Sequence, residues 1–250
     1  RQANGSDGGT VAMEALGGPP ISYYLEIELT TFCNLRCIDC DRQCRQAPSS
    51  EHMTVGQIRR FLNELRSAKT EFEQITLLGG EPLTHPHLFE ILAEFKHHGI
   101  QPYFVTNGYG AQVRQTLRTL LEMGYSVADT RKQSIFQRNF DRMNIAPIDF
   151  GLKAEPCWIL KSCGYGLSRY GFYPCGAGAA IDRVMGFDVG IKALADIGKC
   201  YGLTNILCQY CGHSEAARLI PPEVRISPSW QKALRRYRES RPVLSLYGEE

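Results

Sequence analysis

The sequence predicts an α/β fold in which parallel strands alternate with helices. Segments with the β-branched and aromatic composition of strands alternate with segments whose apolar residues recur at helical spacing, from residue 21 to about residue 130. The connections between successive strands are long enough to hold a helix, which parallel neighbours require. The chain of 250 residues, 43% of them hydrophobic, is long enough to bury one sizeable core. Both an open sheet and a barrel fit this order of elements.

The first strand and helix are predicted between residues 21 and 65. Residues 21–29 (ISYYLEIEL) have the composition of a strand. Thr54 and Gln57 have the spacing of a capping box, in which each side chain bonds the backbone N–H of the other residue. The helix that they begin carries its apolar residues on one face, namely Ile58, Phe61, Leu62 and Leu65.

Three further strands and two helices follow. Residues 74–78 (QITLL) form a short buried strand that ends at a pair of glycines. Pro86 is predicted to begin the next helix, whose apolar face contains Leu88, Leu92 and Phe95. Residues 103–106 (YFVT) form the third strand and residues 125–128 a weaker fourth strand. The helix between these two strands has apolar positions at Val113, Leu117, Leu120 and Leu121.

Composition and charge exclude several classes of protein. No apolar run approaches the roughly 18 to 20 residues that cross a bilayer, and residues 1–20 are polar and Gly-rich, without the pattern of a signal peptide. The net charge of +2, with Lys and Arg evenly spread, is too small for a nucleic-acid binder. Ten cysteines without a secretory signal indicate a reducing, cytoplasmic setting, where clustered thiols more often hold metal or carry out redox chemistry than form disulfides.

Chemically distinctive residues follow each of the first three strands. Cys33, Cys37 and Cys40 come directly after the first strand. Residues 79–82 (GGEP) follow the second strand, and residues 106–108 (TNG) end the third. Because the carboxyl ends of parallel strands meet at one edge, we expect the three groups to share a single site.

The group of three cysteines has one thiol fewer than a closed metal site needs. Soft sulfur ligands select zinc, copper(I) or iron-sulfur clusters. A cubane cluster takes four cysteines, so three leave one iron with an open coordination position that an amino acid could chelate through its amino and carboxylate groups. Gly79 and Gly80 would let the backbone approach such a ligand closely, while Glu81 offers its carboxylate or its loop carbonyls to an ammonium group.

The segments CNLRCIDC (33–40), LGGEPL (78–83) and VTNG (105–108) resemble the motifs of the radical S-adenosylmethionine (radical SAM) superfamily, and the resemblance spans residues 21 to about 130. It implies a partial, shortened (β/α) TIM-type barrel of parallel strands. It also implies a four-iron four-sulfur (4Fe-4S) cluster, ligated by Cys33, Cys37 and Cys40, whose fourth iron binds S-adenosylmethionine. The implied contacts to S-adenosylmethionine involve Gly79, Gly80, Glu81, Pro82, Thr106, Asn107 and Gly108.

The chemistry implied by this resemblance starts with one electron from an external donor such as flavodoxin or ferredoxin. The electron cleaves the sulfonium to give a 5'-deoxyadenosyl radical, which takes a hydrogen atom from a peptide or a small polar metabolite. Epimerisation, oxidation or bond formation would follow. The residue before the third cysteine is usually aromatic in this superfamily; here it is Asp39, so no adenine contact is assigned to it. The competing interpretation is a non-catalytic iron-sulfur or zinc protein for electron transfer or scaffolding.

The last part of the chain contains a second group of cysteines. The candidate ligands of a second metal centre are Cys157 or Cys163, together with Cys175, Cys208 and Cys211. The arrangement is similar to the auxiliary-cluster extensions called SPASM or twitch domains, which favours one twitch-like 4Fe-4S cluster, with zinc as the alternative metal. The glycines of residues 164–166 and 175–178 suit tight turns around such a centre. Three tyrosines are expected to pack over it, with the framing of a substrate pocket as the alternative: Tyr165, Tyr170 and Tyr173.

Cys44 and Cys200 are candidate hydrogen donors to a substrate radical, because thiols have weak S–H bonds. An enzyme that needs an electron acceptor would use an auxiliary cluster instead. His85 and His87 follow Glu81 and are candidates to line the site, but histidines beside a helix start are expected to face solvent. His213, beside Cys211, is a candidate ligand but is expected to cap a turn, because thiols are available.

The expected organisation is a flexible segment (1–20), a barrel core (21–150), a small Cys-rich extension (151–220) and a C-terminal helix and tail (221–250), the helix starting at about Ser229. Only about 120 residues separate Cys33 from the first late cysteine. The later barrel strands must therefore be curtailed, or supplied by the segments around Ile148 and Phe172.

Overall fold

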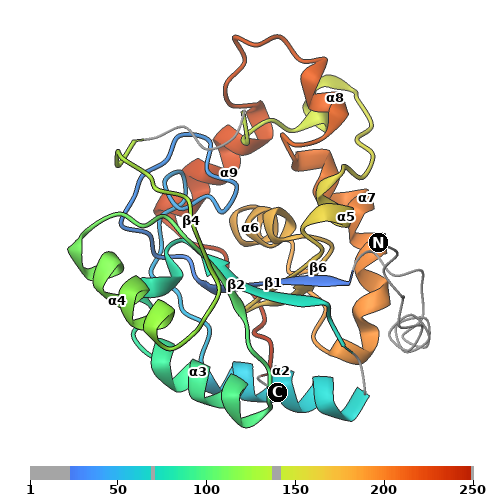
Figure 1. Cartoon of the computed structure of the whole chain (residues 1–250). Coiled ribbons are helices and arrows are strands. Elements are labelled where there is room, and N and C mark those ends of the chain that lie inside the picture. Colours follow the sequence, from blue (N-terminus) through green and yellow to red (C-terminus); the bar gives the residue numbers. More distant parts are fainter. Residues whose placement is uncertain (1–22, 69–70, 137–141, 249–250) are drawn as a thin grey trace, which may run out of the picture.

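The computed structural model describes residues 23–68, 71–136 and 142–248. In these residues, six strands form one sheet in the order β4-β3-β2-β1-β5-β6 (Figure 1). Their bounds are β1 (Tyr24–Thr30), β2 (Gln74–Gly79), β3 (Tyr103–Thr106), β4 (Val127–Asp129), β5 (Tyr165–Ser168) and β6 (Gly171–Tyr173). All neighbouring strands are parallel except β5 and β6, which are antiparallel. The predicted α/β fold of parallel strands is confirmed.

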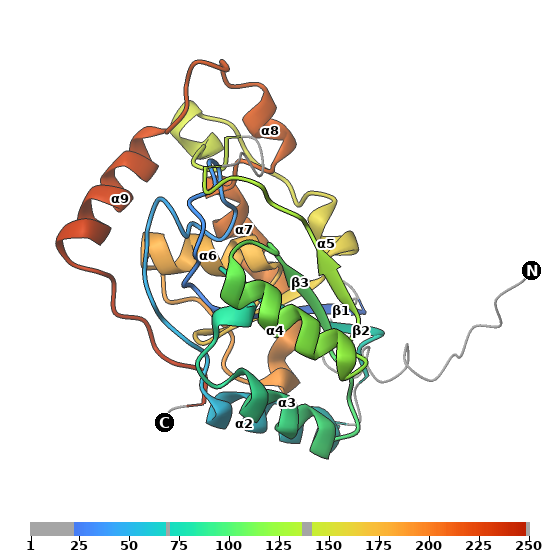
Figure 2. The same ribbon diagram turned by 60° about the vertical axis from the view of Figure 1, so that its left-hand side comes forward.

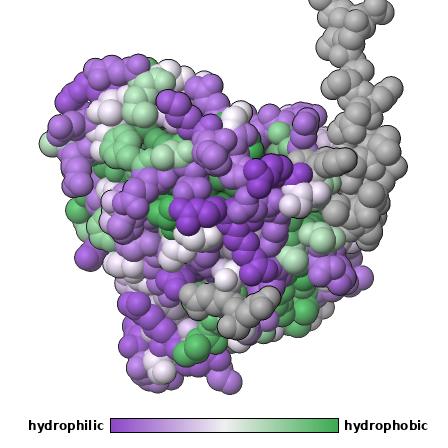
Figure 3. Space-filling view, turned by 90° about the horizontal axis from the view of Figure 1, so that it is seen from below, coloured by the Kyte–Doolittle hydropathy of each residue, from purple (hydrophilic) through white to green (hydrophobic). Residues whose placement is uncertain are grey.

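Three helices cover one face of the sheet: α2 (Val55–Ala68), α3 (Leu88–His97) and α4 (Ala111–Glu122) (Figure 1). Leu25, Ile27 and Leu29 alternate along β1 and are all 0% exposed, because they point into the main hydrophobic core under these helices. The surface seen from below in Figure 3 is mostly hydrophilic, with hydrophobic side chains in separate patches. These helices therefore bury their apolar faces and leave polar faces to solvent.

The predicted elements of the first half are confirmed with small shifts of their bounds. Thr54 and Gln57 form the capping box, and each side chain accepts from the backbone N–H of the other residue at 3.0 Å. β3 has the predicted bounds, whereas α3 begins at Leu88 instead of Pro86. Leu121 is 54% exposed, so it does not belong to the buried face of α4.

The other face of the sheet is covered by α6 (Gly176–Met185), which lies between the sheet and α9 (Pro228–Glu239) (Figures 1 and 2). Trp230 and Tyr237 of α9 pack with Val184 of α6 in a second hydrophobic core. The C-terminal helix thus begins at Pro228, one residue before its predicted start.

The glycine-rich start of α6 corrects the prediction of a tight turn at residues 175–178. Gly176 is the first helical residue and directly follows Cys175. A Cβ on Gly176 would lie 1.5 Å from Nη1 of Arg42, and a Cβ on Gly166 would lie 2.7 Å from the backbone of Cys175. Gly166 is required for the close approach of the strand to the backbone at the start of the helix, and Gly176 leaves room for the buried guanidinium of Arg42.

β5 and β6 bring the Cys-rich region into the sheet. β5 pairs with β1, so that Leu167 lies opposite Ile27. Phe172 belongs to β6, as predicted, but the segment around Ile148 is a short 3-10 helix, η2 (Pro147–Phe150), in which Ile148 is 47% exposed. Pro147 at its start lacks the N–H that a strand would need. The sheet therefore crosses the boundary expected at residue 150.

The remaining elements of the described chain are short. They are η1 (Pro82–Thr84), α5 (Ile159–Ser162), η3 (Leu194–Leu203), α7 (Thr204–Leu207), η4 (Cys208–Tyr210) and α8 (Glu215–Arg218). Among the residues that the structure describes, no helix has the length and apolar character needed to cross a membrane.

Candidate active site

The loops after β1 and β2 are joined at the carboxyl edge of the sheet. The backbone N–H of Gly80 donates to Thr30 O at 2.7 Å, and the N–H of Glu81 donates to Phe32 O at 2.8 Å. A Cβ on Gly79 would lie 2.3 Å from Thr30 O, and one on Gly80 would lie 2.0 Å from Phe32 O. Both glycines are therefore needed for the second loop to press against the cysteine loop.

The Glu81 carboxylate joins the second loop to the third. It is 0% exposed. Its Oε1 accepts from Thr106 Oγ1 at 2.7 Å and from the N–H of Leu83 at 3.1 Å, while its Oε2 accepts from the N–H of Asn107 at 2.8 Å. Burial raises the pKa of Glu81, and these hydrogen bonds oppose the rise. Of the groups considered for an ammonium ligand, the carboxylate is engaged within the fold, and the carbonyls of Glu81 and Pro82 accept from Thr84 and His85. The carbonyls of Gly79 and Gly80 are the loop candidates that remain.

An amide pair ties the third loop to the cysteine loop. Asn107 Nδ2 donates to Asn34 Oδ1 at 2.8 Å, and Asn34 Nδ2 donates to Tyr109 O at 2.7 Å. The same Asn107 Nδ2 lies 3.8 Å from Cys33 Sγ. Asn34 was missed by the sequence analysis, although its place directly after the first cysteine is a usable signal. The three loops thus meet at one rim, where the sequence predicted a shared site.

Pro82 and Gly108 complete the rim loops. Pro82 begins η1 and is buried. Gly108 has a φ of +65°, and a Cβ there would lie 2.1 Å from Asp129 Oδ1 at the end of β4. The third loop is therefore packed against the end of the fourth strand.

The three thiols of the cysteine loop lie in a largely buried environment. Burial raises the pKa of Cys33 to about 12 and also raises the pKa of Cys37. Lys132, which the sequence analysis missed, places its Nζ 3.8 Å from Cys37 Sγ and opposes that rise. Among the described residues, no three His, Cys, Asp or Glu side chains converge on a point that could hold a single metal ion.

This donor set fits a 4Fe-4S cluster. Each cysteine of such a cluster binds a different iron, so its ligands stand farther apart than those of one ion. The Lys132 ammonium beside Cys37 and the Asn107 amide beside Cys33 can stabilise the negative charge of a thiolate cluster. Three cysteine ligands would leave one iron of such a cluster open to a small ligand.

Cys44 lies beside the cysteine loop, whereas Cys200 does not. A hydrogen bond from the Cys44 thiol lowers the pKa of Cys40, and Cys44 is 9% exposed. Cys200 is 0% exposed in the main hydrophobic core, on η3, which packs against α2 and β6. The Asp39 carboxylate, next to the third ligand candidate, accepts from Arg225 Nη2 at 2.7 Å.

Four of the late cysteines line one small apolar cavity together with His213: Cys157, Cys175, Cys208 and Cys211. Cys163 is not among its lining residues. Burial and the nearby Glu26 carboxylate, which forms a hydrogen bond with the thiol, raise the pKa of Cys163 to about 11. The geometry thus favours Cys157 over Cys163 as the fourth member of the group.

The tyrosines predicted to pack over this group do not line its cavity, although Tyr170 and Tyr173 belong to the same hydrophobic core as Cys211. Tyr165 is part of the main hydrophobic core. Tyr170 donates to Glu51 Oε1 at 2.5 Å, and Tyr173 donates to Asp182 Oδ2 at 2.7 Å. Because β5 and β6 belong to the sheet, the Tyr165 ring packs in the core and the Tyr170 and Tyr173 hydroxyls bind carboxylates next to the sheet.

The two histidines after Glu81 differ in exposure. His85 is buried, 5% exposed, with its Nε2 3.0 Å from Met53 O, so the expectation that it faces solvent is wrong. The His85 ring is buried because it packs edge-on against the His52 ring. His87 is exposed, as expected, and pairs with Glu90 at 2.7 Å.

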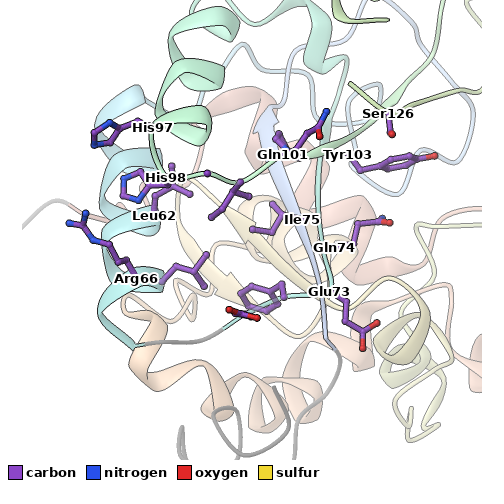
Figure 4. A pocket seen from close by; sticks show the side chains of 16 residues that line it. Leu62, Arg66, Glu73, Gln74, Ile75, His97, His98, Gln101, Tyr103 and Ser126 are labelled. Atoms are coloured by element: carbon purple, nitrogen blue, oxygen red, sulfur yellow. The ribbon is translucent and has the colours of Figure 1, made fainter. Parts of the chain in front are cut away.

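A cavity of about 830 Å³ lies at the opposite end of the sheet from the cysteine loop. Figure 4 shows its lining residues on α2, around the end of α3 and at the amino ends of β2 and β3, among them Arg66, His98, Gln74 and Tyr103. Ligands of α/β folds bind at the carboxyl ends of the strands, so this cavity is not the candidate active site.

A partial barrel of parallel strands, with three thiols and a glycine pair at its carboxyl rim, defines a class of enzymes that bind an iron-sulfur cluster and S-adenosylmethionine. Residues 27–144 match the sequence model of the radical SAM superfamily, so the chain contains a radical SAM domain. The recognition of this superfamily from three motifs is confirmed. Its members are enzymes, and membership implies a 4Fe-4S cluster and S-adenosylmethionine as cofactors.

Several characterised proteins are similar to parts of the chain. It is 33% identical over 81 residues to the AdoMet-dependent heme synthase of Methanosarcina barkeri, covering 32% of the chain and 23% of that enzyme. It is 33% identical over 104 residues to the GTP 3',8-cyclase of Aquifex aeolicus, covering 40% of the chain and 32% of that enzyme. The chain thus spans less than a third of the length of these relatives.

The structure of BtrN in complex with AdoMet and 2-DOIA has a similar fold. The two share a TM-score of 0.50 at 16% sequence identity, over 77% of this chain and 92% of BtrN. The predicted partial TIM-type barrel is therefore confirmed as a fold.

Proposed function

We propose that this protein is a radical SAM enzyme that abstracts a hydrogen atom from a peptide or a small polar metabolite, with Cys33, Cys37 and Cys40 as the ligands of its 4Fe-4S cluster. The observation that carries the proposal is the position of these thiols on one loop at the carboxyl end of β1. The backbone at the start of this loop accepts hydrogen bonds from the N–H groups of Gly80 and Glu81. When bound, the cluster and S-adenosylmethionine supply a one-electron cleavage and a 5'-deoxyadenosyl radical.

The residues of the chain position and protect this chemistry. The Glu81 carboxylate accepts from Thr106 and Asn107, so it does not compete with the carbonyls of Gly79 and Gly80 for an ammonium group. They can accept hydrogen bonds from the ammonium of the methionine part. Lys132 offsets negative charge beside Cys37. The same loops bury the cysteine thiols and so limit the access of water.

We propose in addition that Cys157, Cys175, Cys208 and Cys211 hold one auxiliary metal centre. Their common apolar cavity supports this ligand set. An iron-sulfur centre there could accept an electron from a substrate radical, which supports oxidation or bond formation as the outcome. Cys44, hydrogen bonded to Cys40, is the alternative hydrogen donor and would support epimerisation. Zinc remains the alternative metal and could not accept an electron.

The first experiment measures 5'-deoxyadenosine after anaerobic reconstitution with iron and sulfide and addition of dithionite and S-adenosylmethionine. The wild-type chain is expected to release 5'-deoxyadenosine, and Cys33→Ala is expected to release none above background. Glu94→Gln, which alters an exposed ion pair with Arg59, serves as a folded control with wild-type release. A reconstituted wild-type chain that binds iron but never cleaves S-adenosylmethionine would instead indicate the competing function in electron transfer or scaffolding.

Metal analysis tests the second centre. Two four-iron clusters give about eight irons per chain, and one gives about four. Loss of about four irons in Cys208→Ala would support the ligand set, and the same variant should retain the iron bound at the first loop. About four irons in the wild-type chain, with or without zinc, would remove the auxiliary iron-sulfur centre.

A further inference from the structure

A buried arginine lies between the two groups of cysteines. Arg42 is on the loop that carries Cys40 and Cys44, and its side chain is 9% exposed. Its Nη2 donates to Glu26 Oε2 at 2.5 Å. Its Nη1 is buried and has no hydrogen-bond partner among the residues that the structure describes. A buried donor of this kind is costly unless a further group is present to accept from it.

The guanidinium of Arg42 points to the start of α6, on the side of the late cysteines. A Cβ on Gly176, the first residue of α6, would lie 1.5 Å from Nη1. The amino end of a helix carries a partial positive charge, so a second cation there is unfavourable by itself. An anion beside the start of α6 would therefore be stabilised both by the helix end and by the unpaired Nη1 of Arg42.

A metal centre held by the late cysteines would supply negative charge next to this helix start, through its thiolate ligands. Cys175 directly precedes Gly176 and lines the cavity that it shares with Cys157 and Cys208. Burial raises the pKa of the Cys175 thiol to about 12, and Arg42 opposes that rise. On the other side of Arg42, Glu26 both accepts from the guanidinium and forms a hydrogen bond with Cys163.

We propose that Arg42 raises the reduction potential of the auxiliary centre and that Glu26 opposes it. This inference rests on the auxiliary iron-sulfur centre of the proposed function. A nearby cation stabilises the reduced state, which carries one more negative charge, and a carboxylate destabilises it. Because Arg42 lies two residues from Cys40, it is also a fixed link between the first loop and the second centre.

The test measures the potential of the auxiliary centre alone. In the full chain with Cys33, Cys37 and Cys40 all changed to Ala, anaerobic reconstitution can fill only the second site. The centre takes one electron from dithionite, and electron paramagnetic resonance at a series of fixed potentials follows its reduction. Arg42→Met is expected to change the ratio of reduced to oxidised centre at least tenfold toward the oxidised form, a shift of about 59 mV to lower potential.

The sign of the shift separates electrostatic tuning from a structural defect. Glu26→Gln is expected to shift the potential in the opposite direction, to a higher value, and Arg42→Lys to restore much of the wild-type potential. Arg59→Met removes the arginine of an exposed ion pair with Glu94 and is the matched control, with an unchanged potential. Circular dichroism tests whether each variant is folded. If Arg42→Met does not fold, the inference is decided by whether Glu26→Gln shifts the potential upward.

Opposite shifts in the two variants support the inference. Unchanged potentials, or shifts of the same sign, overturn it while the auxiliary centre itself stands. If the variant without Cys33, Cys37 and Cys40 binds no iron-sulfur centre, the inference and the auxiliary centre both fail. Release of 5'-deoxyadenosine by the wild-type chain still reports separately on the first site.

Discussion

Glu81 shows at the scale of a single residue how a motif side chain serves the fold and the site together. Its carboxylate accepts three hydrogen bonds, from Leu83, Thr106 and Asn107, and so connects the loops after β2 and β3. The backbone on either side of it then faces the cysteine loop. A charged acceptor is needed here because two of the donors are backbone N–H groups that cannot reverse their role.

Glu81→Gln is expected to lower both stability and the yield of 5'-deoxyadenosine. An amide nitrogen would face an N–H donor at one of the carboxylate oxygens, and a buried group left unpaired costs about 1 to 3 kcal/mol. Urea unfolding measures the first effect and the reconstitution assay the second. Glu94→Gln is the matched control on an exposed ion pair. Equal stability and yield in both variants would contradict the role of Glu81.

Gly80→Ala is expected to separate the first two loops. The new Cβ would lie 2.0 Å from Phe32 O, a backbone atom that cannot move without the cysteine loop. Overpacking of this kind costs about 1 to 3 kcal/mol. Gly202→Ala, where a Cβ meets nothing within 4 Å, is the control. Binding of S-adenosylmethionine to the reconstituted chain should fall in the first variant alone, and equal binding in both would contradict the close approach.

At the scale of the elements, β1 separates two environments. Its apolar side chains enter the main hydrophobic core, while Glu28 on the opposite face is 6% exposed in a region that also contains Arg42 and Arg183. Burial raises the pKa of Glu28 to about 7. A strand buried on both faces here combines a hydrophobic side with a charged one, because loop and helix residues supply compensating charges.

Glu28 is expected to make stability fall as pH rises. Its folded pKa of about 7 lies above the ordinary value of 4.5, so the native state binds more protons than the unfolded state between these values. The stabilisation is complete below pH 4.5 and is lost as pH rises through about 7. The urea midpoint is measured for the metal-free wild-type chain and for Glu28→Gln at each pH. The difference, wild type minus variant, should become smaller as pH rises through this window. A constant difference would refute the assignment.

At the scale of the whole molecule, the Cys-rich region and the barrel core form one sheet. β5 lies beside β1, and Leu167 of β5 is 0% exposed in the same core as Ile27. Removal of residues 151–250 would expose the edge of β1 and part of that core. The core and the proposed auxiliary site are therefore expected to unfold together.

Leu167→Ala is expected to destabilise the entire chain by about 2 to 5 kcal/mol, the range for a large-to-small change in a core. Far-UV circular dichroism reports on the secondary structure, and the fluorescence of the buried Trp230, measured with the exposed Trp158 changed to Phe in all variants, reports on the second hydrophobic core. Both signals should shift to lower urea concentration by the same amount. Leu219→Ala, at a side chain that is 74% exposed, is the control. Separate transitions for the two signals would contradict a single cooperative unit.

Much of the first half was predictable because its signals are local. The capping box of Thr54 and Gln57, the strand at residues 103–106 and the three motif loops depend on neighbouring residues and on the geometry of parallel strands. The start of α6 was not predictable. Gly176 suggested a turn, whereas in the structure this glycine is the first residue of a helix and leaves room for the guanidinium of Arg42, far away in the sequence.

The sequence by itself determined the superfamily, the partial barrel and the rim at which three loops meet, because parallel strands oblige the residues that follow them to share one edge. Only the tertiary structure decided that the Glu81 carboxylate is engaged within the fold, that Cys163 faces Glu26, and that the late residues supply β5 and β6. These outcomes depend on contacts between segments distant in the chain, and no local pattern of residues records which partner a buried polar group will meet.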